Sequence, residues 1–208
     1  MNKLSNYSKI FFVLFSLIFI HLSYADEQMS TNKLTRCVTC HTISGNSTTT
    51  IWPKLAEQHA SYMLKQLLEF KKGKDGTRYD PTMVGMLQGV TESDMLELSD
   101  HFSKQVLEKK KIKVNNTDFE AGKNIYLFGD KENNVVACVG CHGITGTGNK
   151  LANFPHLKWQ HKDYIIIQLK KFKKNERSND VNGIMRDISS NMSEQQMNFV
   201  ASYISAMK

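Results

Sequence analysis

Apolar positions recur at steps of three and four residues in several stretches of the chain, which is the spacing of one face of an α-helix. The clearest stretch follows Pro53, and its recurring positions are Leu55, His59, Tyr62, Met63, Gln66, Leu67 and Phe70. Another follows Thr91, which has the character of a helix N-cap, and its apolar stripe is Met95, Leu96, Leu98, Phe102 and Val106. No stretch keeps the alternation of a β-strand, so we expect an all-α fold with long loops.

The same order of positions returns about a hundred residues later, which indicates an internal repeat. Pro53, Leu55, Gln58, His59, Tyr62, Gln66, Leu67, Phe70 and Met83 correspond to Pro155, Leu157, Gln160, His161, Tyr164, Gln168, Leu169, Phe172 and Met185. The capped helix returns as Ser193, Glu194 and Met197, and an extra helix over 119–126 opens the second copy. A charged and then Asn-rich stretch separates the copies. We therefore predict a first domain over residues 26–108, a linker over 109–117 and a second domain over 118–208.

The N-terminal segment has the pattern of an export signal. Lys3 and Lys9 precede an apolar run over residues 10–20, and small residues lead up to Ala25. A membrane span needs about 20 apolar residues, which is more than this run supplies. We predict a signal peptide over residues 1–25 that is cleaved after Ala25, and a mature protein in the periplasm. An uncleaved membrane anchor is the alternative.

One pentapeptide occurs twice, once in each copy of the repeat. Residues 37–41 read Cys-Val-Thr-Cys-His, and residues 138–142 read Cys-Val-Gly-Cys-His. Two cysteines three residues apart on a helical turn can form thioethers to the vinyl groups of a haem, and the next histidine then faces the iron. We therefore predict two covalently bound haem c groups. The thioether residues are Cys37, Cys40, Cys138 and Cys141, and the proximal iron ligands are His41 and His142.

Two other interpretations use the same cysteines. A zinc site could take four thiolates, but the two pairs lie much further apart than those of a zinc ribbon. Two disulfides would also account for an even number of cysteines in an exported chain. Neither interpretation explains why a histidine follows both pairs.

A six-coordinate haem that carries electrons needs a second axial ligand, normally Met or His. The repeat leaves three pairs of candidates, which are Met83 with Met185, Met95 with Met197, and His59 with His161. Met95 and Met197 lie on apolar stripes, where methionine usually fills the core. The two histidines would give bis-imidazole haems, or else each begins a helix on the protein surface. We predict Met83 for the iron of haem 1 and Met185 for that of haem 2, because both lie in Gly-containing loops that could wrap around a haem.

The stretches around the motifs carry a family resemblance. Residues 52–58 match 154–160, the helices with Tyr62 and Tyr164 match each other, and residues 83–86 match 184–186. With the paired haem motifs, these stretches resemble the cytochrome c4 family of di-haem c-type cytochromes along nearly all of the mature chain. The resemblance implies two tandem class I cytochrome c domains with His–Met haems that carry electrons in the periplasm to a terminal oxidase. It also implies Met83 and Met185 as the distal ligands.

The chain carries a formal net charge of +7, which falls to +5 once Lys3 and Lys9 are removed. The basic residues form three clusters, which are Lys71, Lys72, Lys74 and Arg78; Lys109, Lys110, Lys111 and Lys113; and Lys170, Lys171, Lys173, Lys174 and Arg177. Such runs are usually solvated surface, and the alternative is that they steer the protein towards an acidic redox partner. Peripheral association with a membrane is compatible with this charge, and nucleic acid is not an expected partner because no binding motif is present.

These features predict an electron carrier rather than an enzyme, with no catalytic residues. Its partners would be redox proteins, with a quinol-oxidising complex as donor and a terminal oxidase of a respiratory chain as acceptor. One alternative is a redox subunit of a periplasmic dehydrogenase or sulfur-oxidising complex. Another is a haem peroxidase, which needs an open sixth position on one iron. Tyr62 and Tyr164 are expected either to pack as buried aromatics or to donate hydrogen bonds to haem propionates or carbonyls.

Overall fold

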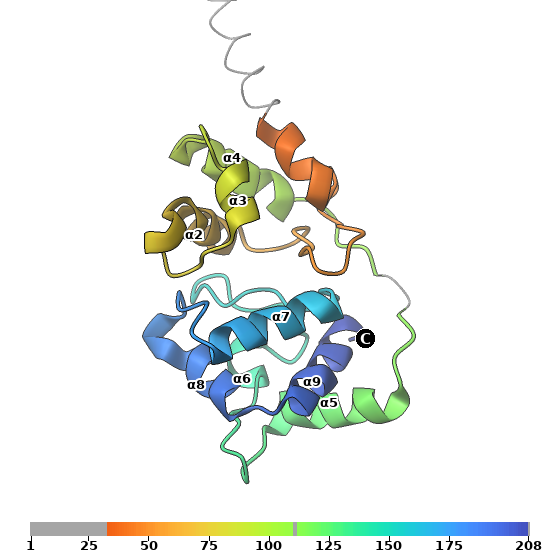
Figure 1. Cartoon of the computed structure of the whole chain (residues 1–208). Coiled ribbons are helices and arrows are strands. Elements are labelled where there is room, and N and C mark those ends of the chain that lie inside the picture. Colours follow the sequence, from red (N-terminus) through yellow and green to blue (C-terminus); the bar gives the residue numbers. More distant parts are fainter. Residues whose placement is uncertain (1–32, 110–111, 208) are drawn as a thin grey trace, which may run out of the picture. The chain divides into compact units, whose positions relative to one another are not determined.

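The computed structural model describes residues 33–109 and 112–207 (Figure 1). The predicted signal peptide, residues 1–25, lies outside this part of the chain. Residues 33–41 are helical, and a compact unit runs from Cys37 onwards. Below, residues 37–109 are called the first half and residues 112–207 the second half.

The first half is built from three α-helices and one 3-10 turn after its cysteine motif. These elements are α2 (Ala60–Lys71), η1 (Gly73–Asp75), α3 (Pro81–Met86) and α4 (Glu92–Ser103). Helix α2 packs against α4 and α3 (Figure 1). The predicted N-cap is confirmed, because the Thr91 hydroxyl accepts from the backbone N–H of Asp94 and the Asp94 carboxylate accepts from that of Thr91.

The apolar stripe of α4 is only partly as predicted. Met95, Leu98 and Phe102 are buried and form the core of the first half, as expected. Leu96 and Val106 are exposed, so their prediction as core residues is wrong. Leu96 follows Met95 directly, so it points to another side of the helix, and Val106 lies beyond the end of the helix at Ser103.

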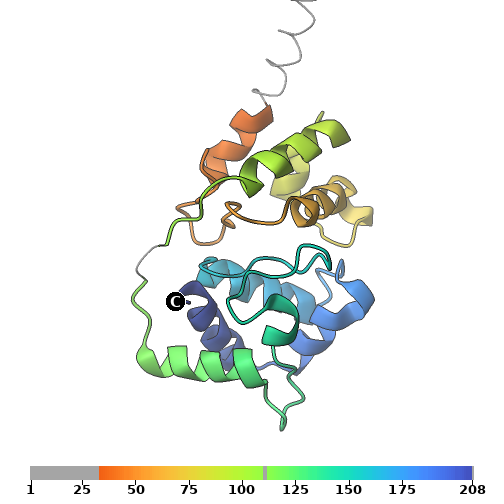
Figure 2. The same ribbon diagram turned by 180° about the vertical axis from the view of Figure 1, so that it is seen from behind.

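The second half has the same order of elements with one helix added in front. The elements are α5 (Asn116–Phe128), α6 (Val139–His142), α7 (Lys162–Lys173), η2 (Val181–Gly183), α8 (Ile184–Asn191) and α9 (Glu194–Ser205). Helix α5, the extra helix predicted from the sequence, packs against α9 and crosses it at a steep angle (Figures 1 and 2). Helix α7 packs against α8 and α9. Ser193 forms a capping box with Gln196 at the start of α9, which repeats the arrangement at Thr91.

Close packing of α5 on α9 depends on one glycine. A Cβ atom at Gly122 would lie 2.0 Å from the carbonyl oxygen of Phe199, well inside van der Waals contact. The Tyr126 side chain, fully buried on the same helix, donates a hydrogen bond of 2.6 Å to the carbonyl of Gly143. Helix α5 therefore ties α9 to the loop directly after the second cysteine motif.

The all-α prediction is confirmed: the described residues form helices, and their only β-type pairs are isolated bridges. The predicted start of the first amphipathic helix at Leu55 is wrong, because α2 begins at Ala60 and His59 is extended. The backbone N–H groups of Leu55 and Ala56 instead donate to the carbonyl of Gly45, which holds this stretch in a loop. Within the described part of the chain, every helix is too short or too polar to cross a membrane.

Candidate haem sites

Each cysteine motif ends in a buried histidine that is held by a backbone carbonyl. Nδ1 of His41 lies 2.9 Å from the carbonyl oxygen of Pro53, and Nδ1 of His142 lies 3.1 Å from that of Pro155. A carbonyl only accepts hydrogen bonds, so Nδ1 carries the proton and the lone pair is on Nε2. Burial lowers the pKa of both histidines, and the bond to proline opposes this only in part. Both imidazoles are therefore neutral and ready to bind a metal through Nε2.

The loop that delivers the proline carbonyl has the same hydrogen bonds in both halves. The carbonyl of Gly45 accepts from the N–H groups of Leu55 and Ala56, and the carbonyl of Gly146 accepts from those of Leu157 and Lys158. Both glycines have positive φ, +67° and +71°, which other residues adopt only with strain. This shared loop geometry places Pro53 and Pro155 over the two histidines.

The four cysteines stand one helical turn apart in pairs. Cys37 and Cys40 lie on the helical residues 33–41, and Cys138 is the N-cap of α6 with Cys141 in its only turn. All four are partly exposed. Burial raises the pKa of the Cys138 thiol to about 12, so it is protonated at neutral pH. Cys37 lies three residues before Cys40 and four before His41, which are the spacings of neighbouring side chains on a helix, and residues 138, 141 and 142 repeat them. This spacing fits two thioethers and one axial nitrogen on a haem.

The rival interpretations of the cysteines do not fit this geometry. Cys40, Cys138 and Cys141 form no disulfide. Among the described residues, no three His, Cys, Asp or Glu side chains are grouped as a zinc site requires. The arrangement of donors therefore fits two haem c groups, as the sequence predicted.

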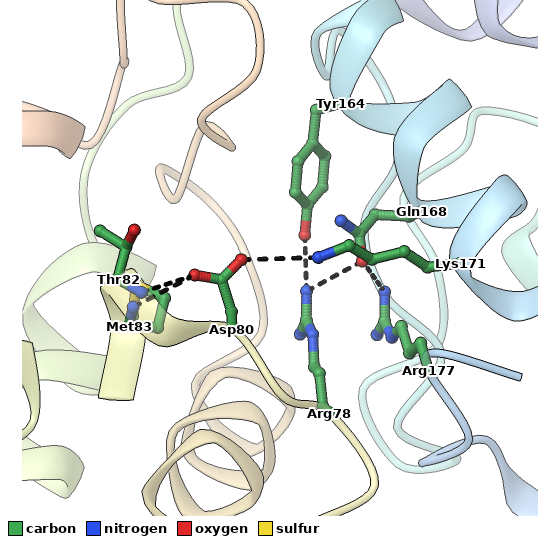
Figure 3. Close-up of polar contacts among 8 residues, drawn as sticks. All are labelled: Arg78, Asp80, Thr82, Met83, Tyr164, Gln168, Lys171 and Arg177. Carbon is green, nitrogen blue, oxygen red and sulfur yellow. Dashed lines mark hydrogen bonds and ion pairs between the residues drawn. The ribbon is translucent and has the colours of Figure 1, made fainter. Parts of the chain in front are cut away.

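Met83 and Met185 lie in helices, so their prediction as loop residues is wrong. Met83 is in α3, where the Asp80 carboxylate caps the helix by accepting from the backbone N–H groups of Thr82 and Met83, and Pro81 is its first residue (Figure 3). Proline at the first position and aspartate at the N-cap are both favoured at helix starts. Met185 is the second residue of α8, which begins at Ile184 after Gly183 and has no side-chain cap.

Both methionines are half-buried. Met185 and Cys138 pack against the same hydrophobic core of the second half. The loops therefore do not wrap the methionines around a haem, and short helices present them instead. Their ligation of iron stays a prediction.

The other candidate ligands are used in packing. Met95 and Met197 are fully buried in the core, as predicted. His161 is not on the surface, because it is buried with Nε2 at 3.0 Å from the Ser47 hydroxyl and 2.9 Å from the Ser47 carbonyl. His59 is half-buried at the N-cap of α2. The prediction of surface positions is therefore wrong for His161.

Two arginines that the sequence placed in solvated clusters are buried. Arg78 is 6% exposed and Arg177 is 5% exposed. Arg78 donates to the hydroxyl of Tyr164 at 2.8 Å (Figure 3). Arg177 donates to the hydroxyl of Tyr62 at 2.8 Å, so each arginine reaches the tyrosine of the other half. The tyrosines thus accept hydrogen bonds from arginine, a role that the sequence analysis did not foresee.

A signal for this network was present in the sequence. Tyr62 and Gln66, with Tyr164 and Gln168, are polar residues on the apolar face of a helix, and they recur in both copies of the repeat. Polar groups that recur on a buried face need partners there, and arginine is the basic residue best suited to hold several acceptors at once.

A pair of glutamines joins the two halves in a reciprocal manner. The buried Gln58 side chain donates to the carbonyl of His156 and accepts from its N–H, both at 3.0 Å. The buried Gln160 side chain does the same to Lys54, at 2.9 and 2.8 Å. Each glutamine thereby satisfies a backbone donor and acceptor of the opposite half.

Comparisons with known proteins agree with this geometry. A family model described as cytochrome c matches residues 30–103 and again residues 119–208. The chain is 37% identical over 172 residues to cytochrome c4 of Thiocapsa roseopersicina, which covers 82% of this chain and 86% of the relative. It is 31% identical to the thiosulfate dehydrogenase electron acceptor of Thiomonas intermedia, covering 82% and 77%. The crystal structure of reduced cytochrome c4 from Pseudomonas stutzeri superposes with a TM-score of 0.81 at 31% identity, covering 87% of this chain and 98% of that one.

Proposed function

Because this chain belongs to the cytochrome c4 family, we propose that it carries electrons through the periplasm in a respiratory chain, towards a terminal oxidase. It is an electron carrier rather than an enzyme, and it holds two covalent haem c groups. Export by a signal peptide over residues 1–25, and domains over 26–108 and 118–208 joined by a linker at 109–117, belong to the same proposal.

One observation carries the proposal: each motif offers two thiols and a buried, neutral histidine whose Nδ1 is already bound to a carbonyl. Haem c supplies the one-electron couple when it is bound. His41 and His142 would hold the iron through Nε2, and the proline carbonyls would fix the imidazole planes. Met83 and Met185 are proposed as the opposite ligands, so that ligation does not change with oxidation state. Burial of both histidines keeps water from the proximal side.

The first test of this proposal is optical. The ferric holoprotein should contain two haems per chain by pyridine haemochrome, and it should show the weak near-infrared band of sulfur-to-iron ligation. Reduced protein should not bind carbon monoxide, because both axial positions are filled. Two haems without the near-infrared band would contradict Met83 and Met185 as ligands, and rapid carbon monoxide binding would favour an open site.

The direction of electron flow needs a kinetic test. Reduced protein can be mixed in a stopped-flow instrument with oxygen and with membranes that contain a terminal oxidase. It should be oxidised at a rate that falls with added salt. Salt dependence is expected because a basic carrier meets an acidic partner. Oxidation no faster than that of the protein mixed with oxygen alone would contradict a terminal oxidase as the acceptor.

A second candidate function is to accept electrons from a thiosulfate-oxidising enzyme. A relative with 31% identity is named a thiosulfate dehydrogenase electron acceptor, and the likeness extends over 82% of this chain. Oxidised protein mixed with thiosulfate dehydrogenase and thiosulfate would then be reduced rapidly. Rapid reduction here together with slow oxidation by the oxidase membranes would favour this function over the first.

A further inference from the structure

The two short helices that carry the candidate methionine ligands begin in different ways. In the second half, α8 follows Gly183, which has a φ of +75° and no side chain that could cap the helix. The residue before it, Asn182, is also left-handed, with a φ of +53°. The backbone that leads to Met185 therefore turns twice through the left-handed region, and α8 lacks the polar side chain that usually occupies the N-cap.

A buried carboxylate takes the place of this cap from further back in the loop. Asp180 accepts from the backbone N–H of Arg186 at 3.0 Å and from Nε of the same arginine at 2.9 Å. The Asp180 side chain is only 3% exposed. Its two hydrogen bonds are charge-assisted and largely shielded from water, which makes them strong. Because Arg186 directly follows Met185, Asp180 ties the loop to the helix next to the candidate ligand.

The first half secures its methionine in another way. Arg186 corresponds in the repeat to Val84, which cannot form an ion pair. Asp80 instead caps α3 directly and accepts from the backbone N–H of Met83 at 3.2 Å, and its other oxygen lies 3.5 Å from Nζ of Lys171 (Figure 3). The Asp80 side chain is 33% exposed. Contacts of such an exposed carboxylate are weakened by water and screened by salt, so the backbone at Met83 is held less firmly than that at Met185.

We infer that Asp180 is a positioning residue for haem 2, because it fixes Arg186 and thereby keeps Met185 in place to bind the iron. This inference rests on the proposed ligation of iron by the two methionines. Methionine has a long, flexible side chain, so the position of its sulfur depends on how firmly its backbone is held. Met185 is therefore the more firmly held distal ligand, and an added ligand displaces Met83 more readily.

The test measures how fast imidazole displaces each methionine from ferric iron, followed by the loss of the near-infrared sulfur-to-iron band. Two backgrounds separate the haems, since the band comes from Met185 alone in Met83→Ala holoprotein and from Met83 alone in Met185→Ala holoprotein. The band should disappear more slowly in the Met83→Ala background. An equal or faster loss there would overturn the order of the two ligands.

Asp180→Asn is then added to each background. In Met83→Ala holoprotein it should speed the loss of the band by about tenfold, which is the effect of losing one charge-assisted hydrogen bond. In Met185→Ala holoprotein it should leave the rate unchanged. Asp187→Asn is the matched control, because it removes an equal charge from an exposed residue of the same helix and should alter neither rate.

Three outcomes would overturn the role of Asp180. The first is a rate in the Met83→Ala background that is no faster with Asp180→Asn than with Asp187→Asn. The second is an equal rise in both backgrounds, which would show a general loosening of the protein. If Asp180→Asn does not assemble with two haems, Arg186→Gln keeps the backbone bond and loses only the side-chain bond. It should also speed the loss of the Met185 band, and an unchanged rate is the third outcome.

Failure of the proposed ligation can be told apart from failure of this inference. If neither Met83→Ala nor Met185→Ala removes part of the near-infrared band, the methionines are not the ligands, and the proposed ligation fails together with the role of Asp180. If both variants remove their part of the band but the rates do not respond to Asp180→Asn, the ligation stands and only the positioning role is overturned.

Discussion

Replacing Gln58 by Ala should weaken the attachment of the two halves to each other. The change removes the acceptor for the N–H of His156 and the donor for its carbonyl, and the acceptor for the N–H of His59 at 3.1 Å. Gln58 is buried, so water reaches these groups poorly. Each buried backbone group left unpaired costs about 1–3 kcal/mol, so we expect a loss of about 2–4 kcal/mol in the free energy of unfolding.

Guanidinium unfolding of the holoprotein, followed both by far-ultraviolet circular dichroism and by haem absorption, measures this loss. Gln160→Ala should have an effect of similar size, because Gln160 holds Lys54 and the N–H of His161 in the same way. Gln195→Ala serves as the control, since Gln195 is exposed on α9. A loss below about 0.5 kcal/mol for Gln58→Ala would refute the reasoning, because surface substitutions have effects of that size.

Three further predictions concern the ligands, the helix packing and the pH dependence. Met83→Ala or Met185→Ala should leave its haem attached but lower that haem's potential and let it bind carbon monoxide; unchanged spectra in both variants would remove the assignment. Gly122→Ala should destabilise the holoprotein by about 1–3 kcal/mol in guanidinium unfolding, because α5 must move away from α9, and an unchanged midpoint would contradict that packing. Burial lowers the pKa of both His59 and His156 from 6.5. The stability that these two neutral imidazoles contribute is therefore complete above that pH and is lost as the pH falls below it. Between pH of about 7.5 and about 5.5, His156→Gln should lose less free energy of unfolding than the wild-type protein does. An equal loss in both proteins would show that His156 does not cause the pH dependence.

The haem motifs could be predicted because their chemistry is contained in five consecutive residues. The helices could be predicted because apolar spacing and capping residues are local, as Thr91 and Ser193 illustrate. The start of α3 is also marked locally, by Asp80 at the N-cap and Pro81 at the first helical position, although glycines nearby are typical of a loop. These elements and motifs could therefore be predicted because the residues that define each of them are close together in the sequence.

The burial of Arg78 and Arg177 could not be read from their neighbours. Each one ends a run of lysines, and a run of basic residues usually faces solvent. Burial of these arginines depends on Tyr164 and Tyr62, which are 86 and 115 residues away along the chain. Such pairs are set by how two segments meet in space, and no periodicity within either segment records it. The repeated polar residues on α2 and α7 were the only trace of it in the sequence.

The reciprocal glutamines have a consequence for how such a chain can arise and be cut. Gln58 binds the backbone of His156, and Gln160 binds that of Lys54, the residue at the equivalent position. A contact made by the same residue on both partners is what a symmetric homodimer uses. The two halves therefore contact each other as the subunits of a symmetric homodimer do, and their covalent connection gives them a high effective concentration for each other. Cleaving that connection would leave a complex whose survival depends on dilution.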